Sequence, residues 1–253
     1  MHDEPVSAGA PARLALDTPR ASRPARLASV VVEELARQIV SGALPEGSLL
    51  PTEGALCEQF GFSRTVMREG MKLLEERGLI RVEQGRGTTV QPRDSWHLLD
   101  PVVLRIALEH DDEMLLLDDL IAVRRLLETE MARSAAARLT EEELAVLAEN
   151  VDRMAGSTDD YARFREYDLA FHACLMRASG SEIGRTVVST IHMYAGKAPH
   201  LSAPGSSESL ERTVEEHRGI LQALAARDGD LAAERIAGHI DSAWDERRRR
   251  NFA

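Results

Sequence analysis

The sequence predicts a mainly α-helical protein in two parts: a small unit of three helices and a hairpin, followed by an antiparallel all-α bundle. Two observations support this prediction. Apolar residues recur at helical spacing through most of the chain, whereas strand-like alternation is confined to residues 79–91. The breaks between the helical patterns of the second half are short and contain Gly, Ser or Pro, which favours antiparallel neighbours in a bundle.

The first part begins with three predicted helices, at residues 27–42, 53–60 and 64–77. Thr52 and Ser63 are suitable N-caps for the second and third of these helices, and Gly61 ends the second one. Residues 79–83 and 88–91 are expected as two strands around a tight turn that contains Gly85 and Gly87. Three helices followed by a hairpin is the order of elements in a winged helix-turn-helix.

The helical patterns of the second part run over residues 113–138, 140–156, 159–179, 182–198, 207–227 and 229–249. We therefore expect a disordered tail at residues 1–25, a winged helix-turn-helix at 26–92, a linker at 93–112 and an all-helical domain at 113–250. The linker assignment depends on two prolines, Pro92 and Pro101.

Charge and composition limit the function classes. The net charge is −11, but residues 1–92 carry 11 basic and 12 acidic residues, so the acidity lies almost entirely in the second part. A DNA-binding first part is therefore compatible with the overall charge, because a local basic face decides DNA binding. The two cysteines show no disulfide spacing, and no apolar run is long enough for a signal peptide or membrane span. These features predict a cytoplasmic protein that does not enter a membrane.

The predicted third helix has a basic face. Arg64, Arg68 and Lys72 follow one another at intervals of four residues, beside Thr65, and aliphatic residues occupy the opposite side. Such a helix fits the major groove, where Arg reads guanine or binds phosphate. A solvated surface helix is the alternative for this pattern alone; the preceding helix and the Gly-Arg-Gly turn favour DNA binding.

Residues 27–90 resemble the DNA-binding domain of the GntR family of regulators. The matching motifs are Pro45-x-Gly47, Leu50-Pro51-x-Glu53, Gly61-x-Ser63-Arg64-x-x-x-Arg68-Glu69, Leu74-x-x-x-Gly78-Leu79 and Gly85-x-Gly87-Thr88-x-Val90. The resemblance implies that the chain contacts double-stranded operator DNA through the third helix and the wing. The expected contact residues are Ser63, Arg64, Thr65, Arg68, Lys72, Gln84, Gly85, Arg86 and Gly87. Gly54 stands where members of the family often have Arg, so a contact made there in relatives is not expected here.

The second part contains a candidate metal site. Asp168 and His172 are four residues apart on one predicted helix, so both side chains leave the same face, and His217 and His239 belong to later helices. A carboxylate and three imidazoles can bind a divalent metal such as Zn, Ni, Mn or Fe. Spacing alone is weak evidence for such a site, because a surface Asp–His pair has the same pattern.

Residues 113–245 resemble the FCD ligand-binding domain of the FadR branch of the GntR family, which strengthens the metal interpretation. The matching motifs are Val123-Arg124-x-x-Leu127-Glu128, Asp168-x-x-x-Phe171-His172, Glu216-His217-x-x-Ile220 and His239. The resemblance implies a metal, with zinc the first expectation, held by Asp168, His172, His217 and His239. It also implies that Arg124 contacts the carboxylate of a small effector, and we place Glu128 in the same effector site.

Several alternatives remain open at this point. Arg124 and Glu128 have the spacing of a simple helical salt bridge. Lining of the effector cavity is an alternative for His192, Tyr194, Lys197 and His200, for which we expect surface or packing roles. The linker segment Trp96 to Pro101 resembles that of members that respond to sugar acids, which favours a sugar acid or hydroxy acid as effector and leaves pyruvate, lactate and a dicarboxylate as alternatives.

The sequence thus predicts a homodimeric, metal-dependent transcription regulator, most simply a repressor, and not an enzyme. The alternatives are a bundle that only dimerises around a structural metal, a metal-dependent enzyme, and a regulator that senses acyl-CoA.

Overall fold

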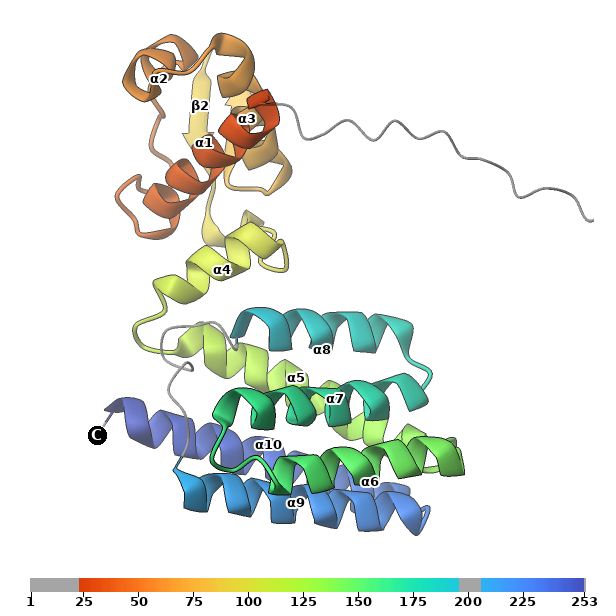
Figure 1. Cartoon of the computed structure of the whole chain (residues 1–253). Helices are drawn as coiled ribbons and strands as arrows, with labels where there is room; N and C mark the ends of the chain where they lie inside the picture. Colours follow the sequence, from red (N-terminus) through yellow and green to blue (C-terminus); the bar gives the residue numbers. More distant parts are fainter. Residues whose placement is uncertain (1–22, 196–205, 253) are drawn as a thin grey trace, which may run out of the picture.

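The computed structural model describes residues 23–195 and 206–252. The N-terminal part consists of α1 (Arg23–Val40), α2 (Glu53–Phe60), α3 (Arg64–Glu76) and a hairpin of β1 (Ile80–Glu83) and β2 (Gly87–Val90). Figure 1 shows this part at one end of the molecule and a bundle of long helices at the other. The mainly helical fold class is confirmed. Of the expected tail, residues 1–22 lie outside the described residues, and Arg23 already belongs to α1.

Local capping determines where α2 and α3 begin. The Thr52 hydroxyl accepts a hydrogen bond from the backbone N–H of Ala55, and the Ser63 hydroxyl accepts one from that of Val66. Gly61 ends α2 with a φ of 68°, in the left-handed region that glycine adopts without strain. These local signals produce the turn between the two helices, as the sequence predicts.

The close approach of α3 to α1 depends on Gly70. A Cβ atom at this position would lie 2.8 Å from Cγ1 of Val31, which is fully buried on α1. On either side of Gly70, Met67 and Met71 of α3 are buried in the same core. The glycine, which is unfavourable in a helix interior, is therefore required by packing.

The hairpin is antiparallel, and its register pairs Ile80 with Val90 and Glu83 with Gly87. Leu49 forms an additional bridge with Thr89, which ties the segment after α1 to β2 on the side opposite β1. The tip therefore projects from a short sheet that is anchored at its base.

Residues 93–112, which the sequence predicts as a linker, contain helix α4 (Pro101–Glu109). Asp100 caps this helix, and Pro101 occupies its first turn, where a missing N–H costs nothing. Val103 and Ile106 of α4 join the N-terminal core, whereas Leu104 and Leu108 join the core of the bundle. The segment is thus a packed helix shared by both cores, and its proline marks a helix start rather than a loop.

The C-terminal bundle consists of α5 (Leu115–Ala136), α6 (Glu141–Ala155), α7 (Tyr161–Ala178), α8 (Glu182–Ala195), α9 (Ser207–Ala225) and α10 (Gly229–Phe252). Its core is almost entirely aliphatic, with Phe171 as its largest fully buried side chain. Three buried histidines interrupt this apolar interior: His172, His217 and His239. Among the helices that the structure describes, none has the length and apolar character needed to span a membrane.

The two helical glycines of the N-terminal part provide a matched stability test. Gly70→Ala should destabilise the protein by about 1 kcal/mol, because the clash with Val31 outweighs the gain in helix propensity. Gly54→Ala should be neutral or slightly stabilising, because the nearest atom to its Cβ, Oγ1 of Thr52, is 3.9 Å away. Urea unfolding of both variants measures the difference. Equal stabilisation by both substitutions would contradict the packing role of Gly70.

Candidate functional site

The predicted DNA-contacting residues of α3 lie on one exposed face. Arg64, Thr65, Arg68 and Lys72 are all exposed, and Ser63 is exposed at the N-terminus of the same helix. The opposite face of α3 packs into the N-terminal core. The arrangement forms a basic ridge that a DNA groove can reach.

Two members of this ridge have carboxylate neighbours. Nε of Arg68 lies 3.1 Å from Oε2 of Glu53, and Nζ of Lys72 lies 3.6 Å from Oε1 of Glu76. The side chains of Arg68 and Lys72 are 72% and 68% exposed. Exposed ion pairs of this kind contribute little free energy, so both cations remain available to phosphate or base edges.

The hairpin tip lies next in the chain, and Gln84, Gly85, Arg86 and Gly87 are all exposed there. Gly85 and Gly87 have φ values of 78° and 94°, which only glycine adopts easily. Nη1 of Arg86 has a loose contact of 3.8 Å with Glu83. The tip therefore presents an exposed cation between two glycines, which suits the edge of a groove.

The structure brings together the four predicted metal ligands within the bundle. Asp168 and His172 belong to α7, His217 to α9 and His239 to α10. One ligand atom from each residue can be chosen so that all four lie within 4.8 Å of one another. The three histidines are buried, and the Asp168 side chain is 25% exposed. Ligand atoms around a metal at about 2.1 Å lie roughly 3–4 Å apart, so only a small closure is needed.

Each histidine is oriented by a hydrogen bond at Nδ1. Nδ1 of His172 lies 2.7 Å from Oε2 of Glu128, and Nδ1 of His217 lies 2.8 Å from the backbone carbonyl oxygen of Thr213. Nδ1 of His239 lies 2.8 Å from Oε2 of Glu216. Because carbonyl and carboxylate oxygens accept hydrogen bonds, each Nδ1 is a donor, which leaves Nε2 as the atom of each ring that can bind a metal.

The Nε2 atoms point toward the cluster and lack ordinary partners. Nε2 of His217 and of His172 lie 3.2 and 3.8 Å from Oδ1 of Asp168, but both nitrogens are buried and neither forms a hydrogen bond. An unsatisfied buried polar atom costs about 1–3 kcal/mol, which a metal ion bound at these atoms would offset. The donor set and the orphaned nitrogens therefore fit a divalent metal.

The protonation states favour metal binding as well. Burial lowers the pKa of His239 to about 4, and the neighbouring charge of His217 contributes. Burial alone would raise the pKa of Asp168, but the neighbouring imidazoles of His217, His172 and His239 hold that pKa well below its usual value. A neutral imidazole and an ionised carboxylate are the forms that bind metals.

Glu128 is the centre of a buried network behind the cluster. Its carboxylate accepts hydrogen bonds from Nε of Arg124 at 2.5 Å, from Nδ1 of His172 and, at 3.0 Å, from Nε2 of His192. Burial raises the pKa of Glu128, but the charges of Arg124 and His172 outweigh it and hold the pKa well below its usual value. The helical salt bridge between Arg124 and Glu128 therefore exists, and Glu128 is not among the residues that line the adjacent cavity.

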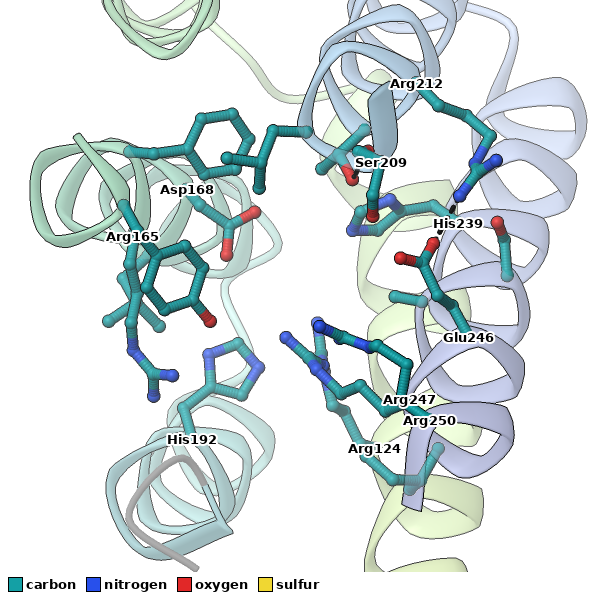
Figure 2. Close-up of a pocket in the computed structure, with 18 residues that line it drawn as sticks. Arg124, Arg165, Asp168, His192, Ser209, Arg212, His239, Glu246, Arg247 and Arg250 are labelled. Carbon is teal, nitrogen blue, oxygen red and sulfur yellow. Dashed lines mark hydrogen bonds and ion pairs between the residues drawn. The ribbon is translucent and has the colours of Figure 1, made fainter. Parts of the chain in front are cut away.

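A cavity of about 100 Å³ adjoins the cluster. Figure 2 shows Asp168 and His239 on one side of it and Arg124, Arg247 and Arg250 on another, with His192 facing them. The full lining is Ile121, Arg124, Tyr161, Phe164, Arg165, Asp168, Leu169, His192, Ser209, Leu210, Arg212, Thr213, His239, Ser242, Ala243, Glu246, Arg247 and Arg250. A small, polar cavity beside four potential metal ligands can hold a small anion.

Sequence reasoning missed several members of this cavity. His192, expected as a surface or packing residue, lines the cavity and donates a hydrogen bond from Nε2 to the Glu128 carboxylate. Arg165 and Arg247 also line the cavity, and no family motif includes them. The available signal was their position on the helices of the metal ligands, since Arg165 precedes Asp168 by three residues and Arg247 follows His239 by eight. Lys197 and His200 lie outside the described residues.

Comparison with known families assigns both parts of the chain. Residues 27–90 match the model of the bacterial regulatory proteins of the gntR family, and residues 119–242 match the FCD domain. A solved structure of Lar, described as controlling expression of the Listeria monocytogenes agr system, shares the fold with a TM-score of 0.55. That match is 19% identical and covers 87% of this chain and 97% of the other.

Two curated relatives are transcription regulators from Escherichia coli (strain K12). The galactonate operon transcriptional repressor is 32% identical over 204 residues, which is 81% of this chain and 89% of the relative. The Glc operon transcriptional activator is 32% identical over 162 residues, or 62% of each chain. These relatives regulate transcription and are not enzymes. The chain therefore belongs to the gntR family of bacterial regulatory proteins, and it is a transcription regulator with an FCD domain.

Proposed function

We propose that this protein is a metal-dependent, homodimeric repressor of the cytoplasm that releases operator DNA when a small sugar acid or hydroxy acid binds in its bundle. The observation that carries the proposal is the opening of a four-residue metal-ligand cluster onto a small cavity that contains arginines. Similarity to a galactonate operon repressor supports the sign of control and the class of effector.

Asp168, His172, His217 and His239 would hold the metal, with zinc the first candidate and nickel, manganese and iron the others. When bound, the metal supplies a Lewis-acidic position to which an acid's carboxylate and hydroxyl oxygens can bind. The adjoining cavity favours such a sensor over a purely structural metal. Its volume of about 100 Å³ also disfavours an acyl-CoA effector, which is far larger.

Arg124 would bind the effector carboxylate. Its Nε pairs with Glu128, which leaves the two terminal nitrogens for a ligand in the cavity. Glu128 would then act as a positioning residue, because the same carboxylate orients both Arg124 and His172. This role replaces the direct effector contact that the sequence suggests for Glu128.

The basic ridge of α3 and the hairpin tip would contact DNA. Two copies of α3 in a homodimer would enter successive major-groove faces of a palindromic operator. Arg64 and Arg68 are suited to base edges or phosphate, and Ser63, Thr65 and Lys72 to phosphate. The tip residues Gln84 to Gly87 would lie along the groove edge.

A chain of contacts connects the two sites. Nε of Arg77, at the end of α3, lies 3.1 Å from Oδ1 of Asp100, which also caps α4. Helix α4 packs against α8, and α8 carries His192, whose Nε2 contacts Glu128. We propose that effector binding shifts α8 and α4 and thereby changes the orientation of α3.

The proposed function is tested by fluorescence anisotropy with DNA from upstream of the chain's own gene and metal-loaded full-length protein. We expect sequence-preferring, salt-sensitive binding that weakens about 5–150-fold when the correct acid is added. Absence of sequence-preferring binding at that region and at neighbouring promoters would contradict the regulator mechanism. Tight acid binding in calorimetry without a change in DNA affinity would contradict effector control.

Arg68→Ala should weaken operator binding by roughly tenfold or more, because a charge-assisted contact to a base or phosphate is lost. Affinity for the effector acid should stay within about twofold, since Arg68 lies on α3 and outside the cavity. Arg153→Ala, which removes an exposed cation of α6, is the matched control and should leave both affinities unchanged. Equal loss of DNA and effector binding in Arg68→Ala would argue against the separation of the two sites.

His217→Ala should lower the metal content of the purified protein and its effector response together, because one of four ligands is removed. His97→Ala removes an exposed histidine outside the cluster and serves as the control. Elemental analysis by mass spectrometry gives the metal content per chain. Unchanged metal stoichiometry in the His217 variant would exclude this residue as a ligand.

Asp100→Asn tests the connection between the sites. Asn preserves the cap of α4, whereas the ion pair with Arg77 loses its charge. We expect an unchanged affinity for the effector and a several-fold smaller effect of the effector on operator affinity. Anisotropy titrations with and without effector measure this ratio. A ratio equal to that of the unmodified protein would remove the Arg77–Asp100 pair from the mechanism.

A further inference from the structure

The cavity contains more positive charge than one carboxylate requires. Five arginines line it, against two carboxylates, Asp168 and Glu246. The arginines come from four different helices: Arg124 from α5, Arg165 from α7, Arg212 from α9, and Arg247 and Arg250 from α10. Bundle packing therefore assembles this charge from segments that are far apart in the sequence.

Part of this charge is already balanced by carboxylates of the protein. Arg124 pairs with Glu128, and Arg212 forms an ion pair with Glu246, whose pKa is also lowered by the nearby charge of Arg250. A metal at the cluster would add two further positive charges beside Asp168. Arg165 and Arg247 are then the lining arginines for which the described residues provide no ion pair, so the cavity keeps positive charge that an anionic ligand can pair with.

Arg247, like Arg165, lines the cavity without an ion pair to any carboxylate of the described residues. The hydroxyl group of Tyr161 shares a hydrogen bond with Arg247, and the Asp168 carboxylate acts on Arg247 through its charge without forming an ion pair. Burial lowers the pKa of its guanidinium, and the neighbouring charge of Arg124 lowers it further. A partly buried cation without a direct ion pair is costly, and an anionic ligand in contact with Arg247 would reduce that cost.

The position of Arg247 separates it from the metal cluster. Arg247 follows His239 by eight residues on α10, which places their Cα atoms about 12 Å apart along the helix. Because helical side chains lean toward the N-terminus, Arg247 reaches back toward the cluster across the cavity. Figure 2 shows its side chain pointing into the cavity on the side away from Asp168. Arg165, which has no ion pair within the described part of the chain, also lines the cavity.

We propose that the effector is a small hydroxy acid with two anionic groups, one held at the metal cluster and Arg124 and the second, a carboxylate or phosphate, held by Arg247. This inference rests on the proposed function and adds to it a second anion site and a narrower class of ligand. Sugar diacids and phosphorylated sugar acids belong to this class, whereas simple sugar acids and two-carbon hydroxy acids lack the second charge. Arg forms oriented, charge-assisted pairs with both carboxylate and phosphate.

The test is calorimetry on metal-loaded, full-length protein with acids that differ only at one end. D-Gluconate, D-glucarate and 6-phospho-D-gluconate are identical at carbons 1 to 5. Carbon 6 is a hydroxymethyl group in D-gluconate, a carboxylate in D-glucarate and a phosphorylated hydroxymethyl group in 6-phospho-D-gluconate. D-Galactonate and galactarate form a second pair with a different stereochemistry. We expect at least one dianion to bind about tenfold or more tightly than its single-charge counterpart, since charged hydrogen bonds are worth this much. The affinities of D-glucarate and 6-phospho-D-gluconate, compared with each other, show whether the second anionic group of the effector is a carboxylate or a phosphate.

Arg247→Gln removes the charge but keeps hydrogen-bonding capacity. It should weaken binding of the preferred dianion about tenfold and leave the single-charge acid within about twofold. Arg249→Gln makes the same change in net charge at an exposed position two residues away and should leave both affinities unchanged. Circular dichroism and metal content of both variants establish that the bundle and cluster are intact.

The contradicting outcomes are distinct from those of the proposed function. Single-charge acids that bind as tightly as their dianionic counterparts would overturn the second anion site and leave acid sensing intact. Equal weakening of single-charge and dianionic acids by Arg247→Gln would assign Arg247 to the common carboxylate and overturn the inference in the same way. If no acid of either stereochemistry binds or alters operator affinity, the proposed sugar-acid sensing itself is contradicted.

Discussion

The bundle depends on an unusual constraint: three imidazoles meet in an aliphatic core, and each is fixed by a hydrogen bond at Nδ1. The partners of these nitrogens are the Glu128 carboxylate, the Thr213 carbonyl and the Glu216 carboxylate. All three proton positions therefore place lone pairs at Nε2, facing Asp168 and one another. Such an arrangement is unfavourable for an empty protein interior and favourable around a cation.

This constraint also explains why the cavity lies where it does. The cluster joins α7, α9 and α10, and Glu128 connects it to α5 and to His192 of α8. A ligand at the cluster therefore touches or adjoins nearly every helix of the bundle. Helix α8, which carries His192 of the cavity lining, packs against α4, and α4 contributes side chains to both cores. The proposed coupling between the two ends runs through these contacts.

Features specified by local sequence could be predicted well. The caps Thr52 and Ser63, the turn at Gly61 and the exposed face of α3 follow from neighbouring residues and helical periodicity, and the helices of the bundle end within a few residues of their expected limits. Helix α4 was obscured because Pro101 indicates both a loop and the first turn of a helix. The requirement for Gly70 is set by Val31 of another helix, and no local pattern contains that contact.

Features that depend on distant helices were less accessible. Asp168 and His172 share a helical face, but their meeting with His217 and His239 was expected from family resemblance and not from spacing. His192 and Arg247 enter the cavity because α8 and α10 lie across it from each other, which periodicity along a single helix does not specify. Charge counted along the chain also hides the cavity, since a strongly acidic second part contains a locally basic interior.

Anomalous diffraction from crystals of the purified protein tests the metal cluster most directly. Data collected on both sides of the absorption edge of the metal identified by fluorescence should show one strong peak per chain among Nε2 of His172, His217 and His239 and the Asp168 carboxylate. Zinc is the metal we expect there. The crystals should be grown from protein purified without chelator. Absence of an anomalous peak at these four residues, or a peak only elsewhere in the bundle, would contradict the account.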